Sequence, residues 1–181
     1  MKNILTLLLL AIVSLQLNAQ DKFYTKSGTL TFESSVPTFE EVKATNTKVT
    51  AVLKSDGNIA SLALMKGFRF KIALMEEHFN ENYMDSDTYP KAKFSGKIKG
   101  FSTADLTEKA STYIILGKLT LHGVTKEISI TSMIRKIGDS IYIDSKFSVT
   151  PEDFNIKIPS IVRKKIAKNV DVTVAFELKK K

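Results

Sequence analysis

The sequence predicts an all-β fold built from antiparallel strands. Apolar and polar residues alternate with a period of two along most of the chain, as in strands with one buried face. The clearest run is 91–99, where one set of alternate positions holds Ala92, Phe94, Gly96 and Ile98 and the other holds lysines and Ser95. Short connections such as Asp56-Gly57 and Gly138-Asp139 suit hairpins. One-sided strands joined by hairpins are typical of antiparallel sheets.

Eight or nine strands are expected in chain order. The alternating runs are 29–33, 48–54, 59–65, 68–72, 91–99, 113–121, 124–134, 141–149 and 170–178. A short helix is expected at 38–44, because Thr38 can cap it and acidic residues follow in its first turn. A second helix is expected at 74–84, where apolar residues recur at helical spacing. No internal repeat or linker divides the chain, so 20–181 should be one domain.

The N-terminal 19 residues are predicted to be a secretory signal peptide. Lys2 precedes an apolar run from Ile4 to about Leu17, and small and polar residues lead to Ala19, after which we place the cleavage. A membrane anchor is the alternative, but the run is shorter than the roughly 20 apolar residues of a spanning helix. An exported protein is therefore expected.

Composition narrows the range of functions. The 181 residues are 43% hydrophobic and 25% charged, which is ordinary for a globular protein. There is no cysteine, so an exported chain must be stabilised by its core rather than by disulfides. The formal net charge of +8 favours anionic surfaces. Nucleic acid is a poor candidate, because the lysines are spread along strand faces rather than gathered in one patch.

The periodicity of the strands is compatible with either a two-sheet sandwich or a barrel. It excludes an outer-membrane barrel, whose apolar side faces lipid, because here the outer face is rich in lysine. A small barrel with an apolar interior can be packed solid or can hold one hydrophobic ligand.

Two longer motifs carry a family resemblance. They are HFNENYMDSDTYPKAKFSGKI at 78–98 and GKLTLHGVTKEISI at 117–130, followed later by Asp153-Phe154. Together they resemble the YceI family of exported lipid-binding proteins over nearly the whole mature chain. The resemblance implies an antiparallel eight-stranded lipocalin-like barrel with one or two short helices, located in the periplasm or secreted. It also implies that a polyisoprenoid, a quinone or a related amphiphile occupies the interior. The chain departs from the family pattern between Ser55 and Ala73, which bears on the ligand more than on the fold.

The candidate ligand-binding residues are the large apolar side chains of the predicted inner face. They are Phe68, Phe70, Ile72, Phe79, Phe94, Ile98, Leu119, Leu121, Phe147 and Phe176. Each would also serve as a core residue if the barrel were solid. Gly96 and Gly117 lie inside strands, where a missing side chain often marks a close approach by a ligand or by another part of the chain.

The entrance is assigned to four polar residues: His78, Arg163, Lys164 and Lys165. The basic segment 160–168 is expected near the barrel opening, where it would attract an anionic head group or membrane surface transiently. The alternative is an ordinary solvated connection.

Catalytic and metal chemistry is not expected. His78 with neighbouring carboxylates does not make the tetrahedral ligand set that zinc prefers. His122, next to Gly123, is interpreted as a bend whose imidazole meets a nearby carbonyl. Two histidines without cysteine or a nucleophile elbow leave no catalytic set. We therefore expect a non-enzymatic lipid carrier or sequestering protein, monomeric or homodimeric, with no cofactor apart from a bound lipid. A stress-related interaction module with a solid barrel is the alternative.

Overall fold

The computed structural model describes residues 21–181, and the predicted signal peptide lies outside them. Nine strands form one sheet: β1 (Lys22–Glu33), β2 (Lys43–Lys54), β3 (Asn58–Leu64), β4 (Arg69–Phe70), β5 (Lys91–Ile98), β6 (Ser111–Leu121), β7 (Val124–Ile137), β8 (Ser140–Val149) and β9 (Val170–Lys180). The helical elements are η1 (Met65–Gly67), α2 (Ala73–His78), the π-helix η2 (Phe79–Tyr83) and η3 (Pro151–Phe154).

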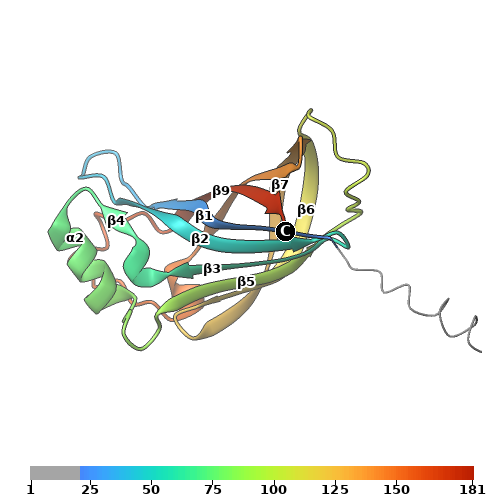
Figure 1. The fold of residues 1–181 in the computed structure, drawn as a ribbon. Coiled ribbons are helices and arrows are strands. Elements are labelled where there is room, and N and C mark those ends of the chain that lie inside the picture. Colours follow the sequence, from blue (N-terminus) through green and yellow to red (C-terminus); the bar gives the residue numbers. More distant parts are fainter. Residues whose placement is uncertain (1–20) are drawn as a thin grey trace, which may run out of the picture.

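The sheet closes into a barrel (Figure 1). The strand order is β1-β9-β8-β7-β6-β5-β3-β2, and antiparallel pairing of β1 with β2 joins the two edges. The ninth strand, β4, only extends the sheet by two residues beside the start of β2. The predicted eight-stranded antiparallel lipocalin-like barrel with short helices is confirmed.

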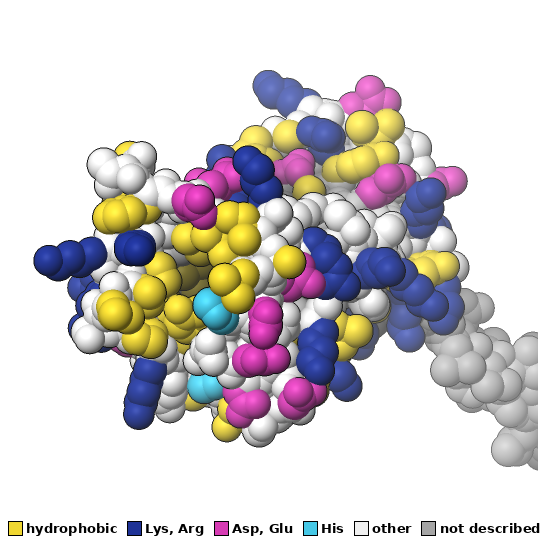
Figure 2. Space-filling model, turned by 90° about the vertical axis from the view of Figure 1, so that its left-hand side faces the viewer, with side chains coloured by type: hydrophobic (Ala, Val, Ile, Leu, Met, Phe, Trp, Pro, Cys, Tyr) yellow, Lys and Arg dark blue, Asp and Glu magenta, His cyan; other side chains and the backbone are white. Residues whose placement is uncertain are grey.

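The two ends of the barrel differ. At one end, which we call the mouth, α2 and η2, the loop 34–42 and the connection 155–169 surround the strand ends (Figure 1). Figure 2 looks onto this end and shows hydrophobic side chains around a hollow, with a histidine at its edge. The mouth thus combines three of the four longer connections with the short turn between β6 and β7, while the fourth longer connection, 99–110, lies at the opposite end.

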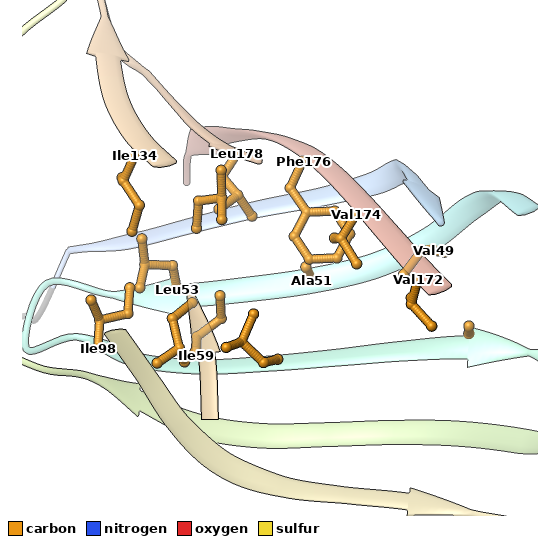
Figure 3. Close-up of a cluster of buried hydrophobic side chains, with 14 of the residues drawn as sticks. Val49, Ala51, Leu53, Ile59, Ile98, Ile134, Val172, Val174, Phe176 and Leu178 are labelled. Atoms are coloured by element: carbon orange, nitrogen blue, oxygen red, sulfur yellow. The ribbon is translucent and has the colours of Figure 1, made fainter. Parts of the chain in front are cut away.

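The opposite end, which we call the closed end, is filled by buried aliphatic side chains, of which Figure 3 labels Leu53, Ile98, Ile134 and Leu178. Five aliphatic side chains meet there, each at most 1% exposed: Leu53, Ile98, Ile134, Ile141 and Leu178. The tight turns β2–β3 and β7–β8 lie at this end. Lys180 forms an ion pair there with Asp21 (Nζ–Oδ2 2.8 Å), which raises the pKa of Lys180.

β5 has the orientation that its sequence predicts. Ala92, Phe94 and Gly96 are partly buried and Ile98 is buried, while the lysines between them are exposed. The helix expected at 74–84 is also confirmed, as α2 followed by the π-helix η2. Its apolar stripe is only partly buried, because Leu74 and His78 are exposed while Phe79 is buried. Local periodicity was sufficient for these elements.

The glycines inside β5 and β6 make room for an aromatic ring. Gly96 and Gly117 are register partners. A Cβ atom on Gly117 would lie 2.6 Å from Phe94 Cζ and 2.5 Å from the Ser95 carbonyl oxygen. The close approach expected at these glycines therefore comes from the protein's own Phe94 and neighbouring backbone.

The helix expected at 38–44 is wrong. Residues 34–42 form a loop, and β2 begins at Lys43. Ala44 is buried in the barrel and is the register partner of both Phe32 and Phe70. Strand pairing and burial of this residue outweigh the weak local preference for helix.

The strand expected at 68–72 is too long. Only Arg69 and Phe70 are strand residues, because the chain turns from there into α2. Glu76 of that helix fixes the turn: its carboxylate accepts the Phe70 amide at 3.1 Å and pairs with Arg69 at 2.8 Å. Ile72 becomes the residue that precedes α2 and is half-buried.

The tight fit at Gly117 gives a first prediction. Gly117→Ala should lower the free energy of unfolding by about 1–3 kcal/mol, because the new Cβ overlaps backbone atoms that cannot move aside easily. Gly138→Asn is the control, since no atom lies within 4 Å of its Cβ position and asparagine tolerates the positive φ. Urea unfolding measures both. Equal stability of the two variants would contradict the prediction.

Candidate functional site

A cavity of about 420 Å³ lies at the mouth. Its inner wall is formed by side chains from the mouth ends of several strands and from the elements next to them: Phe32, Met65, Leu121, Val149, Pro151, Phe154 and Val172. The rim segments add further apolar groups and only a few polar ones, namely Ser34, Glu40, His78 and Lys165. The site is therefore an apolar hollow with its charges at the entrance.

An aromatic cluster anchors α2 and η2 over the barrel. The Phe79 ring lies 5.2 Å from both Phe32 and Phe70, and Phe68 lies 5.2 Å from Phe32. Such ring pairs contribute about 0.5–1.5 kcal/mol each beyond the area they bury. The change from α2 to the π-helix occurs at Phe79, which is buried while His78 is exposed. This arrangement holds the helical segment as one side of the rim.

The residues of the family motifs meet beside the cavity. His122 and Gly123 form the two-residue turn between β6 and β7, with φ of 49° and 76°. His122 Nδ1 lies 3.1 Å from the Phe154 carbonyl oxygen and donates to it in the tautomer that carries its proton on Nδ1. The Tyr89 ring lies 4.5 Å from the imidazole, and a Cβ atom on Gly123 would lie 2.7 Å from Tyr89. The predicted bend with an imidazole at a carbonyl is confirmed.

The structure divides the predicted ligand-binding residues into three groups. Phe70, Phe79 and Leu121 line the mouth cavity. A second cavity of about 60 Å³ lies deeper in the barrel, and four more predicted residues line it: Phe94, Leu119, Phe147 and Phe176. Phe68, Ile72 and Ile98 line neither; Phe68 packs in the aromatic cluster and Ile98 at the closed end.

The predicted entrance residues fall into two groups, those that line the mouth cavity and those that do not. His78 and Lys165 line the mouth cavity, and neither forms an ion pair within residues 21–181. Arg163 and Lys164 lie on the same connection but do not line the cavity, and Arg163 donates to the Ile158 carbonyl oxygen at 3.3 Å.

Sequence reasoning missed the apolar residues that the connections contribute to the cavity: Phe39, Val42, Ile156, Ile158, Val162 and Ile166. These residues follow no strand or helix period. The one available signal was their large apolar character inside otherwise polar segments.

Charge is divided around the rim. The connection 155–169 carries five basic residues and no acidic one, whereas α2 and η2 carry Glu76, Glu77 and Glu81. Each rim segment also exposes one large apolar side chain: Phe39 (44%), Leu74 (56%) and Ile161 (85%). The rim thus combines a basic side, an acidic side and three exposed apolar groups.

Metal-binding groups and membrane-spanning helices were also sought in the described part of the chain. Between residues 21 and 181, no three His, Asp or Glu side chains are placed to hold a metal ion. In the same range, no helix has both the length and the apolar character needed to cross a membrane.

Comparison with known proteins assigns the family. A family model described as a YceI-like domain matches residues 15–178. The chain belongs to the YceI-like family. A UPF0312 protein of Photorhabdus laumondii is 26% identical over 126 residues, which make up 66% of this chain but only 57% of that relative.

Solved structures share the YceI-like fold. A polyisoprenoid-binding domain from Saccharophagus degradans, implicated in plant cell wall breakdown, matches with a TM-score of 0.77 and 14% identity over 88% of this chain and 98% of its own. BcnA of Burkholderia cenocepacia matches with a TM-score of 0.68 and 15% identity, covering 83% and 95% of the two chains. The YceI protein of Campylobacter jejuni matches with a TM-score of 0.60 and 15% identity, covering 79% of this chain and 86% of its own. At these identities the likeness shows the fold.

The contacts of His122 give a second prediction. His122→Asn should lower the free energy of unfolding by about 1–2 kcal/mol, because the Tyr89 ring and the Phe154 carbonyl each lose a partner. Asparagine followed by glycine suits this turn, so backbone strain does not contribute. His78→Asn is the control, because His78 is exposed, and it should change stability by less than about 0.5 kcal/mol. An unchanged or higher stability of His122→Asn in thermal unfolding would contradict the role given to the imidazole.

Proposed function

We propose that this YceI-like protein binds an amphiphilic lipid without covalent chemistry and carries or sequesters it. The observation that carries this proposal is the apolar cavity that opens at the mouth with its charged side chains confined to the rim. A volume of about 420 Å³ is in the range of small-molecule sites. The polyisoprenoid-binding domain among the structural relatives supports a lipid of this general class, such as a polyisoprenoid, a quinone or a related amphiphile.

Burial of the chain supplies the affinity in this proposal. Each methylene group moved from water into the cavity contributes about 0.8 kcal/mol. The head group then lies at the entrance beside His78 and Lys165. An anionic head suits the Lys165 ammonium group best, because that group has no carboxylate partner within the described chain.

Binding is a better account of the site than catalysis or a solid barrel. His122 is engaged by the Phe154 carbonyl and the Tyr89 ring, and His78 is exposed at the rim. Within residues 21–181, neither histidine forms a hydrogen bond with a serine in the manner of a catalytic pair. The alternative of an interaction module with a solid barrel suits the closed end but not the mouth. The proposed place of action is the periplasm or the exterior, on the strength of the N-terminal pattern.

Lipid binding is tested by native mass spectrometry of protein purified from a bacterial periplasm, followed by organic extraction. We expect bound lipid, and uptake of added prenyl lipids by delipidated protein. Val149→Phe places a ring into the mouth cavity and should weaken uptake about tenfold or more, because the chain can no longer bury the same area.

Ile137→Phe is the control for this experiment, since Ile137 is exposed at the closed end and its replacement should leave uptake unchanged. Recovery of ligand-free protein that takes up none of the added lipids would refute the proposed function.

Transient contact of the rim with an anionic membrane is the second part of the proposal. The basic connection 155–169 and the exposed Ile161 lie next to the entrance. Basic residues attract anionic lipid surfaces, and exposed apolar side chains insert among the head groups. Contact at the rim would let a lipid chain pass into the cavity without crossing water.

Charge reversal tests this contact. Lys164→Glu with Lys168→Glu should weaken binding to phosphatidylglycerol vesicles about tenfold or more, since each basic residue near such a surface contributes about 1 kcal/mol. Neither residue lines the cavity, so lipid uptake in detergent should not change. Lys97→Glu with Lys99→Glu alters the net charge equally near the closed end and serves as the control. Equal loss of vesicle sedimentation in both double variants would show that net charge, not the rim, governs binding.

A further inference from the structure

The interior holds two cavities stacked along the barrel axis. They share no lining residue, and their volumes are about 420 Å³ and about 60 Å³. On four strands the inner cavity begins two positions deeper than the mouth cavity: Leu30 lies below Phe32, Leu119 below Leu121, Phe147 below Val149, and Val174 below Val172. Two residues along a strand span about 6.6 Å, which is one layer of inward side chains. The mouth cavity therefore ends at the layer where the inner one begins.

Phe147 lies at the boundary between the cavities. Its register partner on β9 is Val172, and the partner of Val172 on β1 is Phe32. Both partners line the mouth cavity, whereas Phe147 lines the inner one. It is also the largest of the inner-cavity residues that lie two positions below a mouth-cavity residue: Leu30, Ala63, Leu119, Phe147 and Val174. Phe147 thus carries the largest side chain of this boundary layer.

Beyond the inner cavity the barrel is blind. The five aliphatic side chains of the closed end line neither cavity and belong to one buried cluster. Protein interiors of this kind are close-packed, so opening a space in them lowers stability. A chain that enters at the mouth has no passage to the other end.

We infer that the protein selects single-chain amphiphiles by length, with the apolar chain filling the mouth cavity and ending against Phe147. A longer chain leaves its surplus methylene groups in water at the mouth, where they add no affinity. The inference rests on the proposed lipid binding and adds the ligand class, which is one polar head on a chain no longer than the mouth cavity. Phe147 is then a specificity-determining residue.

A homologous series of n-alkyl carboxylates tests the inference. Chains of about eight to about eighteen carbons displace a fluorescent naphthalene sulfonate from delipidated protein, each below its critical micelle concentration. Affinity should rise about fourfold with each methylene while the chain is being buried, and then level off. Phe147→Ala should move the levelling point to chains longer by about two to four methylenes, because the ring no longer separates the cavities.

Two further variants control for stability. Phe147→Leu removes less volume, so it should fold more readily and shift the levelling point by a smaller amount. Phe23→Ala removes the same ring from a buried site near the closed end, where Phe23 is the register partner of Leu53 and lines neither cavity. It should lower the unfolding temperature but leave the levelling point unchanged.

The outcomes separate the inference from the function it rests on. Affinity that rises to the longest chain would overturn the inference while leaving lipid binding intact. So would a levelling point that stays in place in both Phe147 variants when thermal unfolding shows them folded. If no chain of the series displaces the probe, the proposed function fails and the inference fails with it.

Discussion

The pairing of β1 with β2 is the interaction on which the rest of the structure depends. It removes both open edges of the sheet and turns one face of every strand toward a common interior. In this pairing, the register of β1 against β2 shifts twice between Thr25 and Leu30. Between those shifts lies Gly28, where a Cβ atom would be 2.5 Å from the Phe176 ring. The register shifts therefore fall at a glycine that leaves room for a large side chain from the neighbouring strand β9.

A closed barrel need not be hollow, and this one is hollow at one end only. At the closed end, large aliphatic side chains such as Ile134 and Leu178 converge and are buried. At the mouth, side chains from the connections 34–42, 65–90 and 155–169 surround the opening, beside the two-residue turn between β6 and β7. The same inward alternation thus builds a core at one end and a binding cavity at the other.

The residues of the family motifs determine how the mouth is built more than which ligand it binds. Tyr89, His122 and Phe154 are far apart in the sequence and meet there, so that a turn, a strand entry and η3 hold one another in place. Residues suited to decide the ligand lie mostly outside those motifs. The segment from Ser55 to Ala73, where the sequence predicts a departure from the family pattern, contributes Met65 and Phe70 to the cavity wall.

The sequence by itself determined the local elements and the class of fold, because a period of two and a turn such as Asp56-Gly57 act over a few residues. It was enough to orient β5 correctly and to locate the helical segment before it. It failed at 38–44, where capping residues favour a helix but Ala44 is needed between Phe32 and Phe70 in the closed sheet. Only the tertiary structure decided which apolar residues fill the barrel and which line a cavity. That choice depends on the side chains that face each residue from other strands, and on connections such as 155–169 whose apolar residues follow no period.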